Sequence, residues 1–177
     1  MNFKETKIKG LYIITPELKK DVRGTFFRTF CQKELADHGL KFNIVQINYS
    51  LTRQKGTIRG LHYQKKPFEE DKIVLCLKGA IYDVVVDIRQ ESASYGLWES
   101  ANLNAENKKM LYIPKGMAHG FQALTNNCEV LYLMSEFYHS DYATGIRFDD
   151  PLLKINWPLR NQVLSEKDRK WSYLNNE

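Results

Sequence analysis

Short runs of apolar residues recur along the chain and predict β-strands. In the run 81–89 the even positions are apolar, whereas the odd positions include Asp83, Asp87 and Arg89. An extended strand would place these two kinds of side chain on opposite faces. Similar short runs occupy residues 11–15, 25–30, 44–51, 57–63, 72–77, 97–103, 110–113, 121–124 and 129–136.

Few segments have a helical pattern. Only residues 32–38 and the tail after Ser165 look helical, while glycines and the Asn126-Asn127 pair separate the strand runs. Strands at this spacing, without long helices between them, predict an antiparallel sandwich or barrel. No linker, repeat or low-complexity stretch divides the sequence, so residues 1–177 are expected to form a single all-β domain.

The composition is that of an ordered globular protein. Of 177 residues, 43% are hydrophobic and 27% are charged. Cys31, Cys76 and Cys128 are widely separated and contain no C-x-x-C pair, which argues against a disulfide framework or a thiolate zinc site. No signal peptide and no membrane-spanning stretch is expected, so the sequence predicts a cytoplasmic protein with no membrane partner.

The net charge of +5 does not indicate nucleic-acid binding. Acidic residues interleave with most of the basic ones, as in the run 65–72, which is typical of a solvated surface of mixed charge. The remaining positive excess fits an anionic small molecule better than a duplex. No nucleic-acid partner is therefore expected.

Two histidines lie in glycine-flanked, partly apolar segments with cations nearby. His62 lies in Arg-Gly-Leu-His-Tyr-Gln at 59–64, and His119 lies in Ile-Pro-Lys-Gly-Met-Ala-His-Gly-Phe at 113–121. Histidine exchanges protons near neutral pH. A histidine in such a segment could remove a proton next to a carbonyl group, and the nearby cations could stabilise the resulting oxyanion.

These motifs, with others, resemble one known family. Asp-Val-Arg-Gly-Thr-Phe-Phe at 21–27, Gln-Ile-Asn-Tyr-Ser at 46–50, Lys72, Asp-Val-Val-Val-Asp-Ile-Arg at 83–89, Trp-Pro at 157–158 and Leu-Ser-Glu-Lys-Asp at 164–168 complete the set. In this order and spacing they are similar to the dTDP-4-dehydrorhamnose 3,5-epimerase family. The resemblance implies a cupin-type jelly roll with short peripheral helices, and a homodimer whose active sites share residues.

The resemblance also implies a reaction without a cofactor. The substrate would be a 4-keto-6-deoxyhexose linked to a nucleoside diphosphate, used in deoxysugar and O-antigen-type polysaccharide biosynthesis. Its C3 and C5 hydrogens are acidic because both carbons neighbour the C4 ketone. By resemblance His62 would be the base, Asp168 would hold its other ring nitrogen, Lys72 would stabilise the charge on O4, and Tyr132 would return a proton.

The remaining site residues implied by the resemblance bind the substrate. Arg59, His119 and the partner subunit's Arg23 would bind the diphosphate, and Tyr138 would stack on the nucleobase. Gln46 and Asn48 match a polar pair that contacts the ligand.

Each of these residues also has a plainer interpretation. A histidine in a strand is more often a structural residue than a base. Tyr132 alternates with Val130 and Met134, which is typical of a core residue. Asp168 follows Ser165 in a sequence typical of a helix start. Three cations would by default lie at the surface or in a turn: Lys72, Arg59 and Arg23.

Arg59 and His62 have opposite parity on a regular strand and should face opposite ways. We expect a bulge or kink at Gly60 to bring both side chains into one site.

A metal-dependent cupin is the competing interpretation on the same fold. The segment 114–119 resembles the second cupin motif, but the first motif needs a His-x-His pair and here contains His62-Tyr63-Gln64. Glutamine is a poor substitute for imidazole on a transition metal. We expect no metal, and the absence of G-x-G-x-x-G and P-loop stretches implies no nicotinamide or ATP site.

Two departures from the family pattern concern the nucleotide. Arg28 and Ala143 stand where the family has glutamates at the nucleotide end of the ligand. An arginine could meet the N3 acceptor of cytosine, so a CDP-linked substrate with epimerisation at C3 alone is an alternative. A second alternative, from another class, is a catalytically inactive protein that binds sugar nucleotides.

Overall fold

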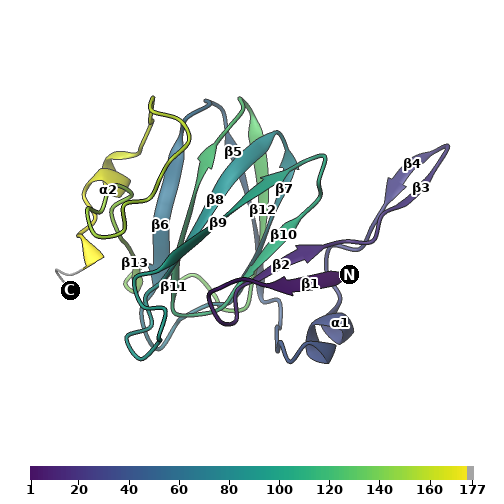
Figure 1. Ribbon diagram of the computed structural model, residues 1–177, viewed down its shortest axis with the longest axis horizontal. Helices are drawn as coiled ribbons and strands as arrows, with labels where there is room; N and C mark the ends of the chain where they lie inside the picture. Colours follow the sequence, from purple (N-terminus) through teal and green to yellow (C-terminus); the bar gives the residue numbers. More distant parts are fainter. Residues whose placement is uncertain (175–177) are drawn as a thin grey trace.

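The computed structural model describes residues 1–174, which form two antiparallel β-sheets packed face to face (Figure 1). The six-stranded sheet runs β1 (Asn2–Glu5), β2 (Tyr12–Thr15), β10 (Met110–Ile113), β7 (Lys72–Lys78), β12 (Cys128–Met134) and β5 (Gln46–Thr52). The five-stranded sheet runs β13 (Ala143–Gly145), β6 (Ile58–Gln64), β11 (Met117–Ala123), β8 (Ala80–Asp87) and β9 (Trp98–Asn104).

Little lies outside the two sheets. A hairpin of β3 (Lys19–Asp21) and β4 (Gly24–Phe26) projects away from the body, and two short helices, α1 (Gln32–Asp37) and α2 (Glu166–Arg169), lie at opposite ends of the molecule (Figure 1). This architecture confirms the predicted all-β, cupin-type jelly-roll class with a few short peripheral helices. Among residues 1–174 no helix has the length and apolar character needed to cross a bilayer.

The main core lies between the sheets. Val74 and Val130 of the six-stranded sheet share a buried cluster with Val85 and Phe121 of the five-stranded sheet. Each fully buried side chain of this kind contributes about 1.5–3 kcal/mol of transfer free energy. The core therefore fixes the spacing between the two sheets.

The outer face of each sheet is also covered. Leu35 of α1 and Phe42 pack on the six-stranded sheet. Leu153 and Trp157, from the C-terminal segment, pack on the five-stranded sheet. This segment then leads to α2, which lies beside β6 (Figure 1). The outer layer thus brings residues after 160 next to the middle of the chain.

Strand β8, which lies between β11 and β9, has the predicted alternation, but both of its faces are buried. Val84 and Val86 pack under the C-terminal segment, while Val85 faces the core between the sheets. Asp83 and Asp87, on the same parity as Val85, have no exposed surface. A buried carboxylate requires charged or hydrogen-bonding partners, and both aspartates have them.

Three short strands have no counterpart in the sequence-based prediction: β1, β3 and β13. Their sequences, Asn-Phe-Lys-Glu, Lys-Lys-Asp and Ala-Thr-Gly, contain too few apolar residues to form a periodic pattern. The predicted strand 25–30 was wrong beyond Phe26, where the hairpin ends. These strands exist because a neighbouring strand supplies backbone hydrogen bonds, which the side-chain pattern does not report.

Candidate active site

A cavity of about 670 Å³ lies between the two sheets, and its size is typical of small-molecule sites. Side chains from β5, β6, β7, β11 and β12 line it, together with residues of the C-terminal segment. Nine of the residues singled out from the sequence line this cavity: His62, Lys72, Tyr132, Asp168, Gln46, Asn48, Arg59, His119 and Tyr138. The fold therefore gathers them from distant parts of the chain.

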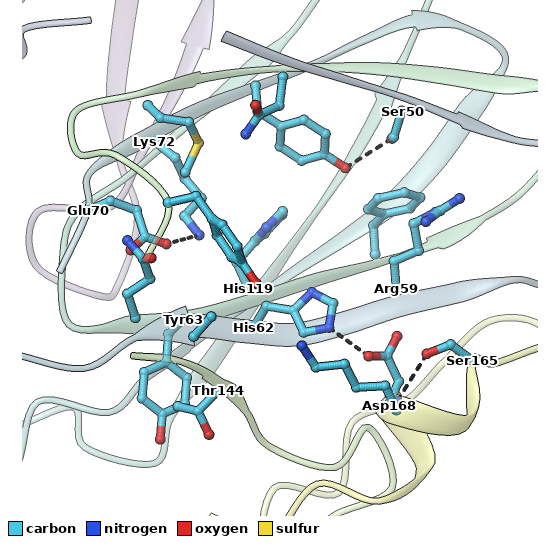
Figure 2. Close-up of a pocket in the computed structure, with 18 of the residues that line it drawn as sticks. Ser50, Arg59, His62, Tyr63, Glu70, Lys72, His119, Thr144, Ser165 and Asp168 are labelled. Carbon is cyan, nitrogen blue, oxygen red and sulfur yellow. Dashed lines mark hydrogen bonds and ion pairs between the residues drawn. The ribbon is translucent and has the colours of Figure 1, made fainter. Parts of the chain in front are cut away.

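His62 and Asp168 form a hydrogen-bonded pair at one side of the cavity (Figure 2). His62 Nε2 lies 2.7 Å from Asp168 Oδ1. The histidine side chain is half exposed, whereas that of the aspartate is buried, so the imidazole alone is accessible to a ligand. Figure 2 shows its other ring nitrogen pointing into the cavity.

Several donors hold the Asp168 carboxylate. Trp171 Nε1 donates to Oδ1 at 3.2 Å, and the Gly60 amide lies 3.4 Å from Oδ2. Burial raises the pKa of Asp168, but the hydrogen bond and charge of His62 outweigh it, so the pKa is lowered overall. An ionised carboxylate can only accept hydrogen bonds, so His62 Nε2 carries the proton and Nδ1 is left as a base.

The predicted helix start and the predicted functional role of Asp168 are both compatible with the structure. Ser165 caps α2, and its side chain accepts a hydrogen bond from the Asp168 amide at 3.0 Å. The short helix thereby orients the Asp168 side chain toward β6. The backbone amide of Asp168 thus takes part in the helix cap, while its carboxylate lines the cavity.

Lys72 lies in the cavity with a partner that sequence reasoning missed. Its Nζ is 2.8 Å from Glu70 Oε1, and both residues are buried, at 6% and 7% exposure. The interpretation of the run 65–72 as a solvated surface was therefore wrong at these two positions. The density of charges in this run suggested solvent, and only the start of β7 at Lys72 could have signalled burial.

His119 also pairs with a buried carboxylate. Its Nε2 lies 2.9 and 3.0 Å from the two oxygens of Asp83. Complete burial raises the pKa of Asp83, although the neighbouring His119 opposes that shift. His119 stands directly opposite His62 in the register between β11 and β6. Asp83 already occupies Nε2, so a ligand could use only the other ring nitrogen. The predicted contact of His119 with diphosphate stays a prediction.

Tyr132 enters the cavity from the six-stranded sheet. Its hydroxyl lies 3.3 Å from the Ser50 hydroxyl on the neighbouring strand β5. Burial raises the pKa of Tyr132 to about 12, so the phenol keeps its proton at neutral pH. Tyr132 lies on the same inner face of β12 as Val130, as the sequence pattern predicted. It packs at the edge of the core and also lines the cavity.

A bulge in β6 brings Arg59 to the same cavity as His62. His119 pairs with His62 and Phe121 with Arg59, so three steps along β6 match two along β11. Gly60 is required there because its φ is +126° and an added Cβ would lie 2.5 Å from a backbone carbon of β11. This confirms the expected irregularity. Hydrogen bonds to Thr52 Oγ1 and the Leu51 carbonyl then hold the Arg59 guanidinium.

Polar and aromatic residues line the cavity near β5. Gln46 Nε2 donates to Asn48 Oδ1 at 3.0 Å, and Gln46 Oε1 accepts from the Tyr138 amide at 3.2 Å. Tyr138 is 60% exposed, so much of this aromatic residue is accessible. Such a surface suits a nucleobase.

Arg23 and Arg28 do not line this cavity within the described chain. Arg23 lies at the tip of the projecting hairpin, where its side chain is 87% exposed and pairs with Asp21. Arg28 pairs with Glu34 of α1, which also binds the N-terminal amine. Figure 1 shows the β3–β4 hairpin pointing away from the body, and Arg23 at its tip is not among the residues that line the cavity of its own chain.

Gln64, the residue at the third position of the first cupin motif, has a structural role. Its Nε2 donates to the Phe68 and Phe137 carbonyls, and its Oε1 accepts from the His139 amide. These bonds use both amide hydrogens and the oxygen of the side chain, and they hold the loop that carries Tyr138 in place. Over residues 1–174, no three His, Cys, Asp or Glu side chains are grouped in a way that could hold a metal ion.

With this geometry established, comparison with known proteins identifies the family. The family described as dTDP-4-dehydrorhamnose 3,5-epimerase matches residues 5–176. The chain belongs to the dTDP-4-dehydrorhamnose 3,5-epimerase family. This confirms the resemblance seen in the sequence motifs, which spans both histidine segments and the segment containing Asp168.

Relatives match over nearly their full lengths. The dTDP-4-dehydrorhamnose 3,5-epimerase of Methanothermobacter thermautotrophicus is 43% identical over 176 residues, which cover 97% of this chain and 94% of the relative. A crystal structure of dTDP-6-deoxy-D-glucose-3,5-epimerase from Legionella pneumophila, in complex with dTDP-4-keto-L-rhamnose, has a TM-score of 0.94 and 41% identity. The match covers 99% of this chain and 93% of that one.

The chain is also similar in structure to an enzyme that inverts a single carbon. The 3'-monoepimerase ChmJ of Streptomyces bikiniensis, in complex with dTDP-quinovose, has a TM-score of 0.90 and 30% identity. The match covers 96% of this chain and 86% of that one. The same fold therefore hosts both double and single epimerases.

Proposed function

We propose that this protein is an isomerase that inverts C3, C5 or both in a 4-keto-6-deoxyhexose linked to dTDP. The observation that carries the proposal is that His62 and Tyr132 come from opposite sheets and face one cavity. Inversion at carbon requires a base on one side and a proton donor on the other. The relatives named above act on dTDP-linked sugars of this kind.

Proton removal is the first step of the proposed reaction. His62 Nδ1 takes the hydrogen from a carbon next to the ketone, and the C–H electron pair forms an enolate with its charge on O4. Asp168 stabilises the imidazolium that results, because its carboxylate already accepts the Nε2 hydrogen at 2.7 Å. General base catalysis of this kind contributes typically ~10²–10⁴-fold to a rate.

The enolate is then stabilised and protonated from the other side. Lys72, which is itself buried at 6% exposure, donates to O4, where negative charge develops. The Tyr132 phenol, protonated because its pKa is raised to about 12, gives its proton to the opposite face of the carbon. The tyrosinate then recovers a proton from solvent or from His62 in a later step.

We further propose a homodimer that completes the site. Exposed apolar residues lie on the projecting hairpin and on the edge strand β5: Val22, Phe26, Ile47 and Tyr49 are 105%, 73%, 58% and 55% exposed. A hairpin that crosses to a second copy would bury this surface and bring the partner subunit's Arg23 to the diphosphate. Sedimentation equilibrium tests this, since a monomer at micromolar concentration would reject it.

The preference for one nucleotide over another can also be tested. Ala143 lines the cavity in place of the family's glutamate, and this difference keeps a CDP-linked substrate as the alternative. Arg28, the residue that could meet cytosine, is instead paired with Glu34. We therefore expect dTDP to bind more tightly than CDP. We also propose a cytoplasmic location and a role in deoxysugar biosynthesis; the free state of Cys31, Cys76 and Cys128 supports a reducing compartment.

Hydrogen exchange provides the decisive experiment. The protein is incubated in D2O with the dTDP- or CDP-linked 4-keto-6-deoxyhexose, and deuterium at C3 and C5 is followed by NMR. We expect incorporation with the dTDP form, and its complete loss in His62→Ala. Binding without exchange for either nucleotide would reject the enzyme and favour the non-catalytic binding protein. A faster reaction with the CDP form would reject the thymidine assignment.

A further inference from the structure

One polar atom in the cavity lacks the partner that its position demands. Glu70 Oε1 accepts a hydrogen bond from Lys72 Nζ, but Oε2 is buried and has no hydrogen-bond partner among the residues that the structure describes. Glu70 is 7% exposed, and it lines the cavity beside Lys72 (Figure 2). Almost all buried side-chain oxygens in proteins accept a hydrogen bond, so an orphan of this kind calls for an explanation.

The ion pair with Lys72 does not by itself explain the orphan. A residue needed only to hold Lys72 could do so through one oxygen with the other directed to solvent or to a backbone amide. Glu70 instead keeps its second oxygen enclosed, without a partner, in the wall of the cavity that the residue lines. A carboxylate accepts hydrogen bonds and donates none, so the missing partner must be a donor such as a hydroxyl.

We propose that Glu70 is a specificity-determining residue whose free oxygen accepts a hydrogen bond from the sugar hydroxyl next to the ketone, at C3. This inference rests on the proposed function, in which Lys72 donates to O4. The ketone carbon has two ring neighbours: C3 carries a hydroxyl, whereas C5 carries a methyl group. The only donor attached next to the ketone is therefore the C3 hydroxyl.

The ion pair would thus recognise an α-hydroxyketone as a unit. Lys72 Nζ and Glu70 Oε1 are 2.8 Å apart, so groups that bond to the two side chains must also be neighbours. O3 and O4 are such neighbours, and they become coplanar when the C3–C4 enolate forms. Lys72 then meets the oxygen that gains charge, and Glu70 meets the one that keeps its hydrogen.

The test measures, in each variant, the ratio of kcat/KM between two substrates. A nucleotide-linked 3-deoxy-4-keto sugar lacks the C3 hydroxyl but keeps the acidic hydrogen at C5, so C5 exchange in D2O is measurable for both it and the parent sugar. We expect the wild-type protein to favour the parent by roughly 10- to 150-fold in kcat/KM, the range for a hydrogen bond to a charged group. Glu70→Ala should reduce the preference to about threefold or less.

The ratio removes the effect of Glu70 on Lys72, because a displaced lysine slows exchange of both substrates alike. If Glu70→Ala does not fold, the isosteric Glu70→Gln serves instead, and the preference should fall at least about threefold because the acceptor is no longer charged. Glu69→Gln, the adjacent carboxylate outside the cavity, is the matched control and should keep the wild-type ratio.

The outcomes separate the inference from the function on which it rests. A wild-type preference that survives unchanged in both Glu70 variants would overturn the assignment of Glu70, and so would a wild-type protein that treats the two substrates equally. Exchange of neither substrate by the wild-type protein would instead reject the proposed epimerase. A preference that falls in the Glu70 variants and persists in Glu69→Gln supports the inference.

Discussion

Replacing Asp168 by asparagine preserves the shape of the side chain and removes its charge. In the wild-type structure, His62 and Trp171 donate to Oδ1, and the Gly60 amide faces Oδ2. A side-chain amide has one acceptor oxygen and one NH2 donor. In either orientation the introduced NH2 group must therefore oppose at least one N–H group, either that of Gly60 or those of Trp171 and His62.

The two orientations predict different losses. With the amide oxygen toward His62, the proton stays on Nε2 and the loss is that of a charge-assisted hydrogen bond, about 1.5–3 kcal/mol. At about 1.36 kcal/mol per factor of ten, kcat falls roughly 10- to 150-fold. With the NH2 group toward His62, Nε2 must accept and the proton moves to Nδ1, which removes the base and lowers kcat by up to ~10⁴-fold.

Steady-state deuterium incorporation at C3 and C5 measures the effect. Because Asp168 acts through His62, kcat should fall while KM changes by less than about threefold. Asp149→Asn is the matched control: it also removes an aspartate charge, but it breaks only an ion pair with Arg147 away from the cavity. It should retain wild-type kcat within about twofold, since exposed pairs contribute little.

The reasoning would be refuted by a folded Asp168→Asn protein whose kcat stays within about twofold of the wild type. It would also fail if KM rose while kcat stayed constant, because the carboxylate would then bind ligand directly and would not orient the imidazole.

Three further predictions concern other parts of the molecule. Tyr132→Phe should still exchange hydrogen but should not invert the carbon, as NMR of the product stereochemistry would show. Burial raises the pKa of Asp87, but hydrogen bonds from Arg89 and the serines at 92 and 94 outweigh it and lower the pKa from 3.8 to about 2. Asp87→Asn should therefore lower the free energy of unfolding by about 2 kcal/mol at pH 7, as denaturant titration would measure. Gly60→Ala should lower it by at least ~2 kcal/mol, because the added Cβ meets Gly120 and φ is positive.

Each of these predictions has a result that contradicts it. Normal inversion by Tyr132→Phe would remove that residue from the reaction. For Asp87 the folded pKa lies below the unfolded one, so its stabilisation is complete above pH ~4 and disappears as the pH falls through about 2. A difference between Asp87→Asn and the wild type that stays constant from pH 7 to pH 2 would contradict the assignment. Wild-type stability in Gly60→Ala would show that the bulge tolerates a side chain.

The sequence predicted the fold class because strand periodicity and turn residues report directly on a two-sheet protein. It also predicted the irregularity at Gly60, since Arg59 and His62 could share a site only if the strand broke its alternation. The edge strands β1 and β13 were missed, because backbone pairing rather than side-chain pattern creates them.

Glu70 and Asp83 show where sequence reasoning ended. Glu70 lies among lysines and acidic residues, a context typical of solvent, and its burial follows only from the packing of the loop before β7. Asp83 had the correct parity, but its partner His119 is 36 residues away, on the adjacent strand. Pairings over such separations depend on sheet order, which the local pattern does not contain.

The separation of the His62–Asp168 pair also has a consequence for synthesis of the protein. The two residues are 106 positions apart, and every strand of both sheets precedes Asp168 in the chain. During translation, a nascent chain could assemble the whole sandwich on the ribosome while its imidazole still lacked the carboxylate. Under the proposed mechanism, the enzyme remains inactive until the segment that carries Asp168 has emerged and packed against β6, so activity requires this late segment.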